Sequence, residues 1–243
     1  MKTKKILLID LETSPLICYT WGTYEQNALK VIKEWRILCF AWKWLGDKKT
    51  NIVSLNEYGD DEAKLVGVLW ELFNQAEIVM AHNGDHFDVK KSNAKFIEHG
   101  LTPPSTYKTI DTLKVARQKF KFTSNRLDAL GEHLGLGRKK QTGGFELWDK
   151  CMQGDEKSWR KMEAYCKQDV RLLEKVYLRL RPWFSNHPNM NLYNKTESCC
   201  PNCGSKKVQR RGFSYTRVNK FQRWQCLNCG SWHQSPLNNV KIR

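Results

Sequence analysis

The sequence predicts an α/β fold with a mixed central sheet, followed by a small cysteine-rich domain. Three observations support this prediction. Apolar runs of strand length come first, later strand-like runs alternate with segments of helical periodicity, and two cysteine pairs lie in a basic C-terminal segment. Strands that alternate with helices indicate parallel neighbours, whereas strands joined by a tight turn are antiparallel.

Length and composition narrow the class of protein. A chain of 243 residues with 40% hydrophobic residues can bury a substantial core and is expected to fold. No apolar run approaches the roughly 20 residues that a membrane helix needs. The apolar stretch that ends before Asp10 is also shorter than the core of a secretory signal. We therefore expect a soluble, cytoplasmic protein without a membrane partner.

The charge is distributed unevenly along the chain. Lys and Arg number 41 against 25 acids, which gives a formal net charge of +16. Residues 194–243 hold ten of these bases and one acid, whereas the rest holds 31 bases and 24 acids. Such an excess is typical of proteins that bind nucleic acid, although a merely soluble basic protein would share it.

Hydrophobic periodicity and turn signals give the order of the elements. A Gly-Asp turn at 46–47 joins two strand candidates and predicts a hairpin. The predicted elements are strands at 5–11, 36–44 and 51–55, a helix at 62–75, a strand at 77–82, a helix at 88–98, a short strand at 108–111 leading into a helix, and helices at 126–134 and 156–180.

Two acids lie at the end of the first predicted strand. Asp10 and Glu12 are two residues apart, and alternate residues of a strand face the same side. Acids at the end of a buried strand are costly unless a cation or hydrogen-bond donors compensate them. Because Mg²⁺ and Mn²⁺ prefer carboxylate oxygens, the pair is a candidate metal site, although Asp-x-Glu also occurs in solvated turns.

Two later segments place polar groups where α/β proteins often place function. Residues 82–88, His-Asn-Gly-Asp-His-Phe-Asp, lie where a strand gives way to a helix. Asp88 is a candidate metal ligand there, or else an acid favoured by the helix dipole. Tyr165 and Asp169 are four residues apart on the long helix and share a face, as a routine surface tyrosine and acid would also do.

The three motifs together resemble a known family. In chain order they are Asp10-x-Glu12, Asn83-x-x-x-Phe87-Asp88 and Tyr165-x-x-x-Asp169. Their order and context are similar to those of the DEDDy branch of the DEDD 3′→5′ exonucleases. The resemblance extends over about residues 4–180 and implies an RNase H-like core with a mixed five-stranded sheet.

The resemblance also implies a mechanism with two divalent ions. Asp10 would bridge two Mg²⁺ or Mn²⁺ ions, and Glu12 and Asp169 would complete the first site. Asp88 would help to hold the second. Tyr165 would orient the attacking water, since a phenol with a pKa near 10 is a better positioner than base at neutral pH. The products would be nucleoside 5′-monophosphates released from a 3′ end.

Three neighbouring positions receive other roles. Asn83, in the same motif as Asp88, is a candidate contact to the nucleic acid. We expect a structural role for His82, because the four acids already supply ligands and hard ions do not need an imidazole. Asp111 begins a further segment that resembles the family, and we expect it to be structural or close to the substrate.

The C-terminal cysteines have the spacing of a zinc ribbon. Cys200 with Cys203 and Cys226 with Cys229 form two C-x-x-C pairs, separated by 22 residues. This pattern is typical of four thiolates that hold one tetrahedral Zn²⁺. Disulfide or redox pairs are the alternative, and they would be unusual inside a cell. Cys199 is then a spare thiol, with His233 a less favoured substitute ligand.

Basic and aromatic residues alternate between the two cysteine pairs. Cations beside aromatics are typical of a nucleic-acid surface, although the aromatics could instead form a miniature core. Because so short a domain has little core, zinc would supply much of its folding energy. The candidate nucleic-acid contacts are Lys206, Lys207, Arg210, Arg211, Arg217, Lys220 and Arg223.

We therefore expect an exonuclease domain at 1–185, a linker at 186–198 and a basic zinc-ribbon domain at 199–243. The predicted activity is 3′→5′ exonuclease, with DNA and a single-stranded 3′ end as the expected substrate. Since no polymerase-sized region is present in these residues, proofreading would need a polymerase or other replication or repair protein as partner. Two alternatives stay open: a 3′→5′ exoribonuclease, and a non-catalytic nucleic-acid-binding protein on an exonuclease scaffold.

Overall fold

The computed structural model describes residues 5–24, 26–138, 143–193 and 199–238. Within it the chain divides into two compact units. The first contains residues 1–114 and 122–176, and the second contains residues 115–121 and 177–243.

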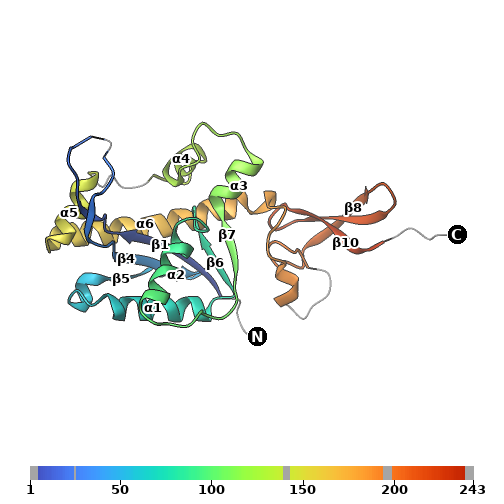
Figure 1. The fold of residues 1–243 in the computed structure, drawn as a ribbon. Helices are drawn as coiled ribbons and strands as arrows, with labels where there is room; N and C mark the ends of the chain where they lie inside the picture. The colour runs from blue at the N-terminus through green and yellow to red at the C-terminus, as the bar shows by residue number, and fades with distance from the viewer. Residues whose placement is uncertain (1–4, 25, 139–142, 194–198, 239–243) are drawn as a thin grey trace. The chain divides into compact units, whose positions relative to one another are not determined.

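The first unit is built on a five-stranded sheet with the order β5-β4-β1-β6-β7 (Figure 1). The central strand β1 is antiparallel to β4 and parallel to β6, so the sheet is mixed as predicted. The predicted hairpin is the antiparallel pair β4 and β5. The strand bounds are β1 (Ile6–Thr13), β4 (Ile37–Trp44), β5 (Asn51–Ser54), β6 (Ile78–Ala81) and β7 (Lys108–Asp111).

Helices cover both faces of this sheet. Figure 1 shows α1 and α2 on one side and the long helix α6 on the other. The helices are η1 (Leu55–Tyr58), α1 (Glu62–Gln75), α2 (Asp88–Glu98), α3 (Thr112–Lys119), α4 (Leu127–His133), α5 (Phe145–Met152) and α6 (Glu156–Leu180).

A buried ion pair joins the first two helices to the sheet. Lys95 on α2 is 1% exposed, and its Nζ lies 3.2 Å from the carboxylate of Glu62 on α1. The other oxygen of Glu62 accepts the N–H of Ile37, at the start of β4, at 2.7 Å. A buried charge is tolerated only when it is paired and hydrogen-bonded, and Glu62 meets both conditions.

Three elements of the first unit, two strands and a helix, were not predicted from the sequence. Strands β2 (Ile17–Tyr19) and β3 (Lys30–Lys33) form a separate two-stranded hairpin, and α5 precedes α6. The residues of β3 are exposed on both faces, so they show no apolar alternation. Helix α5 has eight residues and buries only Leu147 and Cys151, too few for a periodic signal.

The second unit contains a three-stranded antiparallel sheet in the order β10-β9-β8. Its strands are β8 (Val208–Tyr215), β9 (Lys220–Cys226) and β10 (Trp232–Asn238), and its short 3₁₀ helices are η2 (Arg181–Trp183) and η3 (Met190–Tyr193).

Residues before the first cysteine pair contact it within this second unit. The amide of Asn202 donates to the carbonyl of Arg181 at 3.0 Å, and the N–H of Met190 donates to the carbonyl of Pro201 at 2.7 Å. Part of the predicted linker, residues 194–198, lies outside the described residues. Among the described helices, none combines the length and the apolar character that a membrane crossing requires.

The turn between β6 and α2 leaves no room for a side chain at Gly84. A Cβ there would lie 2.5 Å from the Cβ of Ala81. We expect Gly84→Ala to lower the free energy of unfolding by about 1–3 kcal/mol, because overpacking displaces the backbone. Urea denaturation of both proteins measures the difference.

Gly67 in the interior of α1 provides the control, because a Cβ there would meet nothing within 4 Å. Gly67→Ala should raise stability by roughly 0.5–1 kcal/mol, as is usual for Gly→Ala in a helix. Equal unfolding midpoints for Gly84→Ala and the unaltered protein would show that the turn is not tightly packed.

Candidate active site and candidate metal centre

Three acids from two elements meet in the first unit. Asp10 and Glu12 lie on β1 and Asp169 lies on α6, and each offers a carboxylate oxygen within 4.8 Å of the others. Asp169 is fully buried, whereas Asp10 and Glu12 are half-buried. The sequence-predicted acids of the first and third motifs therefore form one cluster.

The register of β1 explains why the two strand acids face α6. Asp10 lies opposite Ala41 and Glu12 lies opposite Cys39 on β4. Lys43 follows on the same face of β4, and its Nζ lies 2.6 Å from the carboxylate of Glu174 on α6. Because alternate strand residues share a face, all of these positions point toward the long helix.

Cys166 fixes the contact between α6 and β1, a role that no sequence motif indicated. Its thiol donates to the carbonyl of Asp10 at 3.2 Å and lies 3.6 Å from an oxygen of the Asp10 carboxylate. The N–H of Ala41 donates to the same sulfur at 3.2 Å. Burial raises the pKa of Cys166 well above its ordinary value, so the thiol keeps the proton that it donates.

Asp88 approaches the same strand from the other side. It is 3% exposed, and its Oδ1 accepts the N–H of Leu11, the residue between Asp10 and Glu12, at 3.0 Å. Asp88 is not a member of the three-residue cluster found among the described residues. The second motif thus contacts β1 through the hydrogen bond that the Asp88 carboxylate accepts from the backbone of the strand.

Tyr165 lies one helical turn before Asp169 on α6 and is half-buried. Its ring packs edge-on against Trp148 of α5, with the ring centroids 6.4 Å apart. The helix that sequence reasoning missed therefore restrains the predicted water-orienting tyrosine.

The turn that leads into α2 is held by Asp111. One oxygen of this buried carboxylate accepts the N–H of Asn83 at 3.0 Å and the N–H of Leu113 at 2.9 Å. Asn83 has a φ of 70°, an uncommon left-handed conformation that these bonds stabilise. Asp111, expected to be structural or close to the substrate, thus holds the turn that precedes α2.

His82 connects three segments of the first unit. Its Nδ1 lies 2.9 Å from the hydroxyl of Thr112, and its Nε2 lies 2.9 Å from the carbonyl of Asn125. Both ring nitrogens thus have protein partners, which agrees with the structural role expected for His82.

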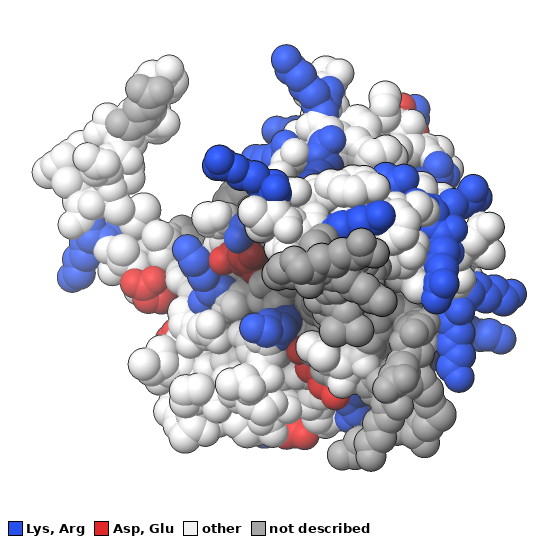
Figure 2. Space-filling model, turned by 90° about the vertical axis from the view of Figure 1, so that its right-hand side faces the viewer, with Lys and Arg blue, Asp and Glu red and all other residues white. Residues whose placement is uncertain are grey.

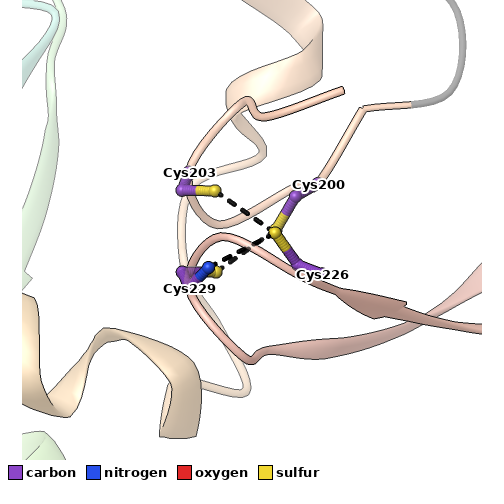
Figure 3. Close-up of side chains that lie close together, drawn as sticks. All are labelled: Cys200, Cys203, Cys226 and Cys229. Atoms are coloured by element: carbon purple, nitrogen blue, oxygen red, sulfur yellow. Dashed lines mark hydrogen bonds between the residues drawn. The ribbon is translucent and has the colours of Figure 1, made fainter. Parts of the chain in front are cut away.

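The four cysteines of the two C-x-x-C pairs form a second cluster, in the second unit. Figure 3 shows their side chains pointing toward one another from two loops. The sulfurs of Cys200 and Cys229, and those of Cys203 and Cys226, lie 3.6 Å apart. These separations are far longer than the ~2.05 Å of a disulfide bond.

Matching hydrogen bonds build the two cysteine loops. The N–H of Gly204 donates to the carbonyl of Cys200 at 2.8 Å, and the N–H of Gly230 donates to that of Cys226 at 2.9 Å. Both glycines have φ above 70°, a conformation that favours Gly. Equal loops explain how two distant segments present equivalent sulfur pairs.

Crowding also changes how the thiols titrate. Hydrogen bonding with Cys200 raises the pKa of Cys203 and lowers the pKa of Cys229.

Cys199 is buried but is not part of the cluster, and neither is His233. The ligand set available to a metal here is therefore the four predicted cysteines.

The three-stranded sheet places basic side chains over aromatic rings. Arg210 lies over Trp224 at 5.3 Å from the ring centroid, and Lys220 lies over Phe213 at 4.1 Å. Figure 2 shows a face of the molecule with many Lys and Arg side chains and few acids. The other predicted cations, all exposed, are Lys206, Lys207, Arg211, Arg217 and Arg223.

A mixed five-stranded sheet, flanked by helices and carrying acids on its central strand, defines an RNase H-like α/β protein. The chain belongs to the RNase_H superfamily, because the family model RNase_H_2 matches residues 25–181. This match includes Asp88, Tyr165 and Asp169 and begins after Asp10 and Glu12.

Two polymerases are similar to parts of the chain. The DNA polymerase catalytic subunit of Psittacid herpesvirus 1 (isolate Amazon parrot/-/97-0001/1997) is 26% identical over 180 residues, which are 73% of this chain and 15% of that protein. The family B DNA polymerase of the hyperthermophilic archaeon Pyrobaculum calidifontis is 15% identical, with a TM-score of 0.47 over 74% of this chain and 26% of that one. The chain thus spans a small part of each.

Proposed function

We propose that the protein is a metal-dependent 3′→5′ exonuclease that releases nucleoside 5′-monophosphates. The observation that supports this proposal best is the cluster of Asp10, Glu12 and Asp169, whose carboxylate oxygens lie within 4.8 Å of one another. Membership of the RNase_H superfamily supports nuclease chemistry at such a cluster. The 3′→5′ direction rests on the resemblance of the three motifs to the DEDDy exonucleases.

The donor set of the cluster fits Mg²⁺ or Mn²⁺. All three groups offer oxygen ligands, which these hard cations prefer. Carboxylates this close repel one another, and a divalent cation offsets that repulsion. Two bound ions would supply an activated water and stabilise the charge on the leaving 3′ oxygen.

The residues of the site have distinct proposed roles. Asp10 would contribute to both ions, and Glu12 and Asp169 would complete the first site. Asp88 would help to hold the second ion, and its Oδ1 also accepts the N–H of Leu11. The phenol of Tyr165 would orient the attacking water.

We propose DNA as the substrate, because the herpesvirus relative is the catalytic subunit of a DNA polymerase. The same similarity supports association with a polymerase or another replication or repair protein. Asn83, held by Asp111 in the turn before α2, is a proposed contact to the strand. RNA remains the alternative substrate, and a direct assay distinguishes the two.

A cleavage assay tests the proposal. The protein is incubated with 5′-labelled single-stranded DNA, duplex DNA and RNA, with Mg²⁺, Mn²⁺ or EDTA. We expect a stepwise ladder on DNA that requires metal. Asp169→Asn should abolish it, and Tyr165→Phe should lower kcat about 100-fold with little change in KM, because positioning a proton-transfer partner is worth roughly that much.

Glu71→Gln is the matched control, because Glu71 is an exposed acid on α1 outside the cluster. It should cleave at the unaltered rate. A ladder on RNA alone would assign the exoribonuclease alternative. Binding without shortening of any substrate would exclude the enzyme and favour a nucleic-acid-binding scaffold.

We propose further that Cys200, Cys203, Cys226 and Cys229 hold one structural Zn²⁺. Four sulfurs each roughly 2.3 Å from a central ion would lie about 3.8 Å from one another in a tetrahedron. The observed 3.6 Å separations are close to this value. All four positions carry sulfur, which leaves no open position of the kind found in catalytic zinc sites.

Loss of one ligand should remove both the metal and the fold around it. We expect about one zinc per chain by elemental analysis and none in Cys203→Ser, because a four-thiolate site needs all of its ligands. Amide protection against hydrogen exchange should then fall across β8–β10 and persist in β1 and β4. Cys18→Ser, a half-buried thiol on β2, is the control and should keep its zinc. A Cys203→Ser protein that retains zinc and protection would contradict the assignment.

We propose that the three-stranded sheet β8–β10, here called the basic sheet, tethers the substrate. Cations held over aromatic rings can meet phosphates while the ring edges and remaining faces meet bases. Lys220 lies near both Phe213 and Tyr215, and Arg223 lies 4.9 Å from the centroid of Trp232. Charge and stacking groups are thus combined on this sheet.

The salt dependence of nucleic-acid binding tests whether the basic sheet is a tether. The triple variant Arg210→Gln, Lys220→Gln and Arg223→Gln should lower the slope of log Kd against log salt by about 2, at roughly 0.7 per phosphate contact on a single strand. The control is Lys48→Gln, Lys49→Gln and Lys64→Gln, three exposed bases of the first unit with the same total charge. Equal slopes in the two variants would show that net charge alone, and not this sheet, governs binding.

A further inference from the structure

We propose that the β2–β3 hairpin holds the single strand close to the acidic cluster, with bases stacked on Trp21 and Tyr24. This inference rests on the proposed function, because it names the part of the first unit that positions that substrate. Figure 1 shows the hairpin, in dark blue, extending from the sheet near α5.

The hairpin exposes more aromatic surface than a folded protein leaves to water without a purpose. Trp21 is 88% exposed, Tyr24 is 78% exposed and Tyr19 is 63% exposed. Apolar residues on the strands, Ile17 and Ile32, are also 45% and 49% exposed. Exposed apolar residues gathered on one element in this way are typical of an interaction surface.

The hairpin begins beside the cluster and its base is closed there. Ser14 lies two residues after Glu12, and its N–H donates to the carbonyl of Arg36 at 2.8 Å. The N–H of Arg36 donates in return to the hydroxyl of Ser14 at 2.9 Å. The hairpin is therefore inserted between β1, the strand that carries two of the acids, and β4.

The other end of the hairpin is fixed to the helix that carries Asp88. Trp35 follows β3, and the ammonium groups of Lys91 and Lys95 lie 3.5 Å and 4.5 Å from its ring centroid. Lys91 is one turn after Asp88 on α2. The two ends of the hairpin are thus attached to β1, which carries Asp10 and Glu12, and to α2, which carries Asp88.

Hydrogen bonds within the tip give it a defined shape. The N–H of Leu29 donates to the carbonyl of Tyr19 at 2.9 Å, which closes the loop. The hydroxyl of Thr20 donates to the carbonyl of Gly22 at 2.8 Å, and the amide of Gln26 donates to the carbonyl of Tyr24 at 2.9 Å. A preformed platform loses less conformational entropy on binding than a loose loop does.

The chemistry around the rings matches a nucleic-acid strand. Lys30 and Lys33 are exposed on β3 and can meet phosphates. A cavity of about 330 Å³ at the base of the hairpin is lined by Ile17, Lys33 and Trp159 among others. Aromatic rings for bases and cations for the backbone are the combination that single-strand-binding surfaces use. The hairpin directly follows β1, the strand that carries Asp10 and Glu12, and this favours a nucleic-acid strand over a protein partner.

Binding and cleavage of an oligonucleotide series test the proposal with the full chain. Fluorescence anisotropy in EDTA gives Kd for a labelled 20-mer and for copies that lack one base at successive positions from the 3′ end. We expect Trp21→Ala to raise Kd about tenfold, because one stacked base contributes roughly that much. We also expect one abasic position that weakens the unaltered protein and has no further effect on Trp21→Ala. Trp21→Phe should restore most of the affinity.

Ile97→Ala is the control, because Ile97 on α2 is 79% exposed and lies outside the hairpin. It should bind and cleave like the unaltered protein. An unchanged Kd and abasic profile in Trp21→Ala would overturn the proposal. A dimer that sediments as a monomer after Trp21→Ala would also overturn it, in favour of self-association.

The measurements separate this proposal from the proposed activity. Loss of affinity in Trp21→Ala, in a protein that cleaves no substrate with Mg²⁺ or Mn²⁺, would support the hairpin and contradict the nuclease. Metal-dependent cleavage with the same KM in Trp21→Ala and the unaltered protein would support the nuclease and contradict the hairpin.

Discussion

The contact between β1 and α6 is the interaction on which the acidic cluster depends. Asp10 and Asp169 are far apart in sequence, and only the packing of the long helix against the central strand brings them within ligand distance. That packing is apolar over most of its length, since Val170, Leu173 and Val176 are buried. The hydrophobic contribution of this face offsets the cost of burying carboxylates, which would otherwise disfavour the fold.

The backbone at residues 10–12 is satisfied from two sides. The parallel pairing of β1 with β6 ends at Leu8, so the N–H of Leu11 has no partner in β6. Asp88 accepts that N–H, and the thiol of Cys166 donates to the carbonyl of Asp10. Asp10 itself stays paired with Ala41 of β4, so the Cys166 thiol adds a further hydrogen bond to its carbonyl. The Asp88 carboxylate takes the place of a strand partner for the N–H of Leu11, where β1 runs past β6.

The sequence predicted the elements that bury a periodic face. The helices at 62–75, 88–98 and 156–180 and the strand at 108–111 have the predicted bounds, because their apolar spacing and end signals are local. The β2–β3 hairpin was not predicted because β3 is exposed on both faces and β2 has three residues, of which only Cys18 is half-buried. The hydrogen bonds of Cys166 and of the Asp88 carboxylate to β1 were not predicted for another reason. Both depend on how α6 and α2 register against β1, which no local pattern encodes.

The two units of the chain offer different chemistry to their ligands. Oxygen ligands in the first unit favour hard ions and sulfur ligands in the second favour zinc, so the two proposed sites would bind different metals. In the basic sheet the cations are also fixed in place. Arg223 donates to the carbonyl of Arg211 at 2.9 Å and lies over Trp232. A guanidinium held in this way would lose little rotamer freedom on meeting a phosphate, so the proposed tether would need few contacts to a strand. Weak, ordered contacts of this kind suit the proposed tether, which would have to release its strand as the proposed cleavage advances.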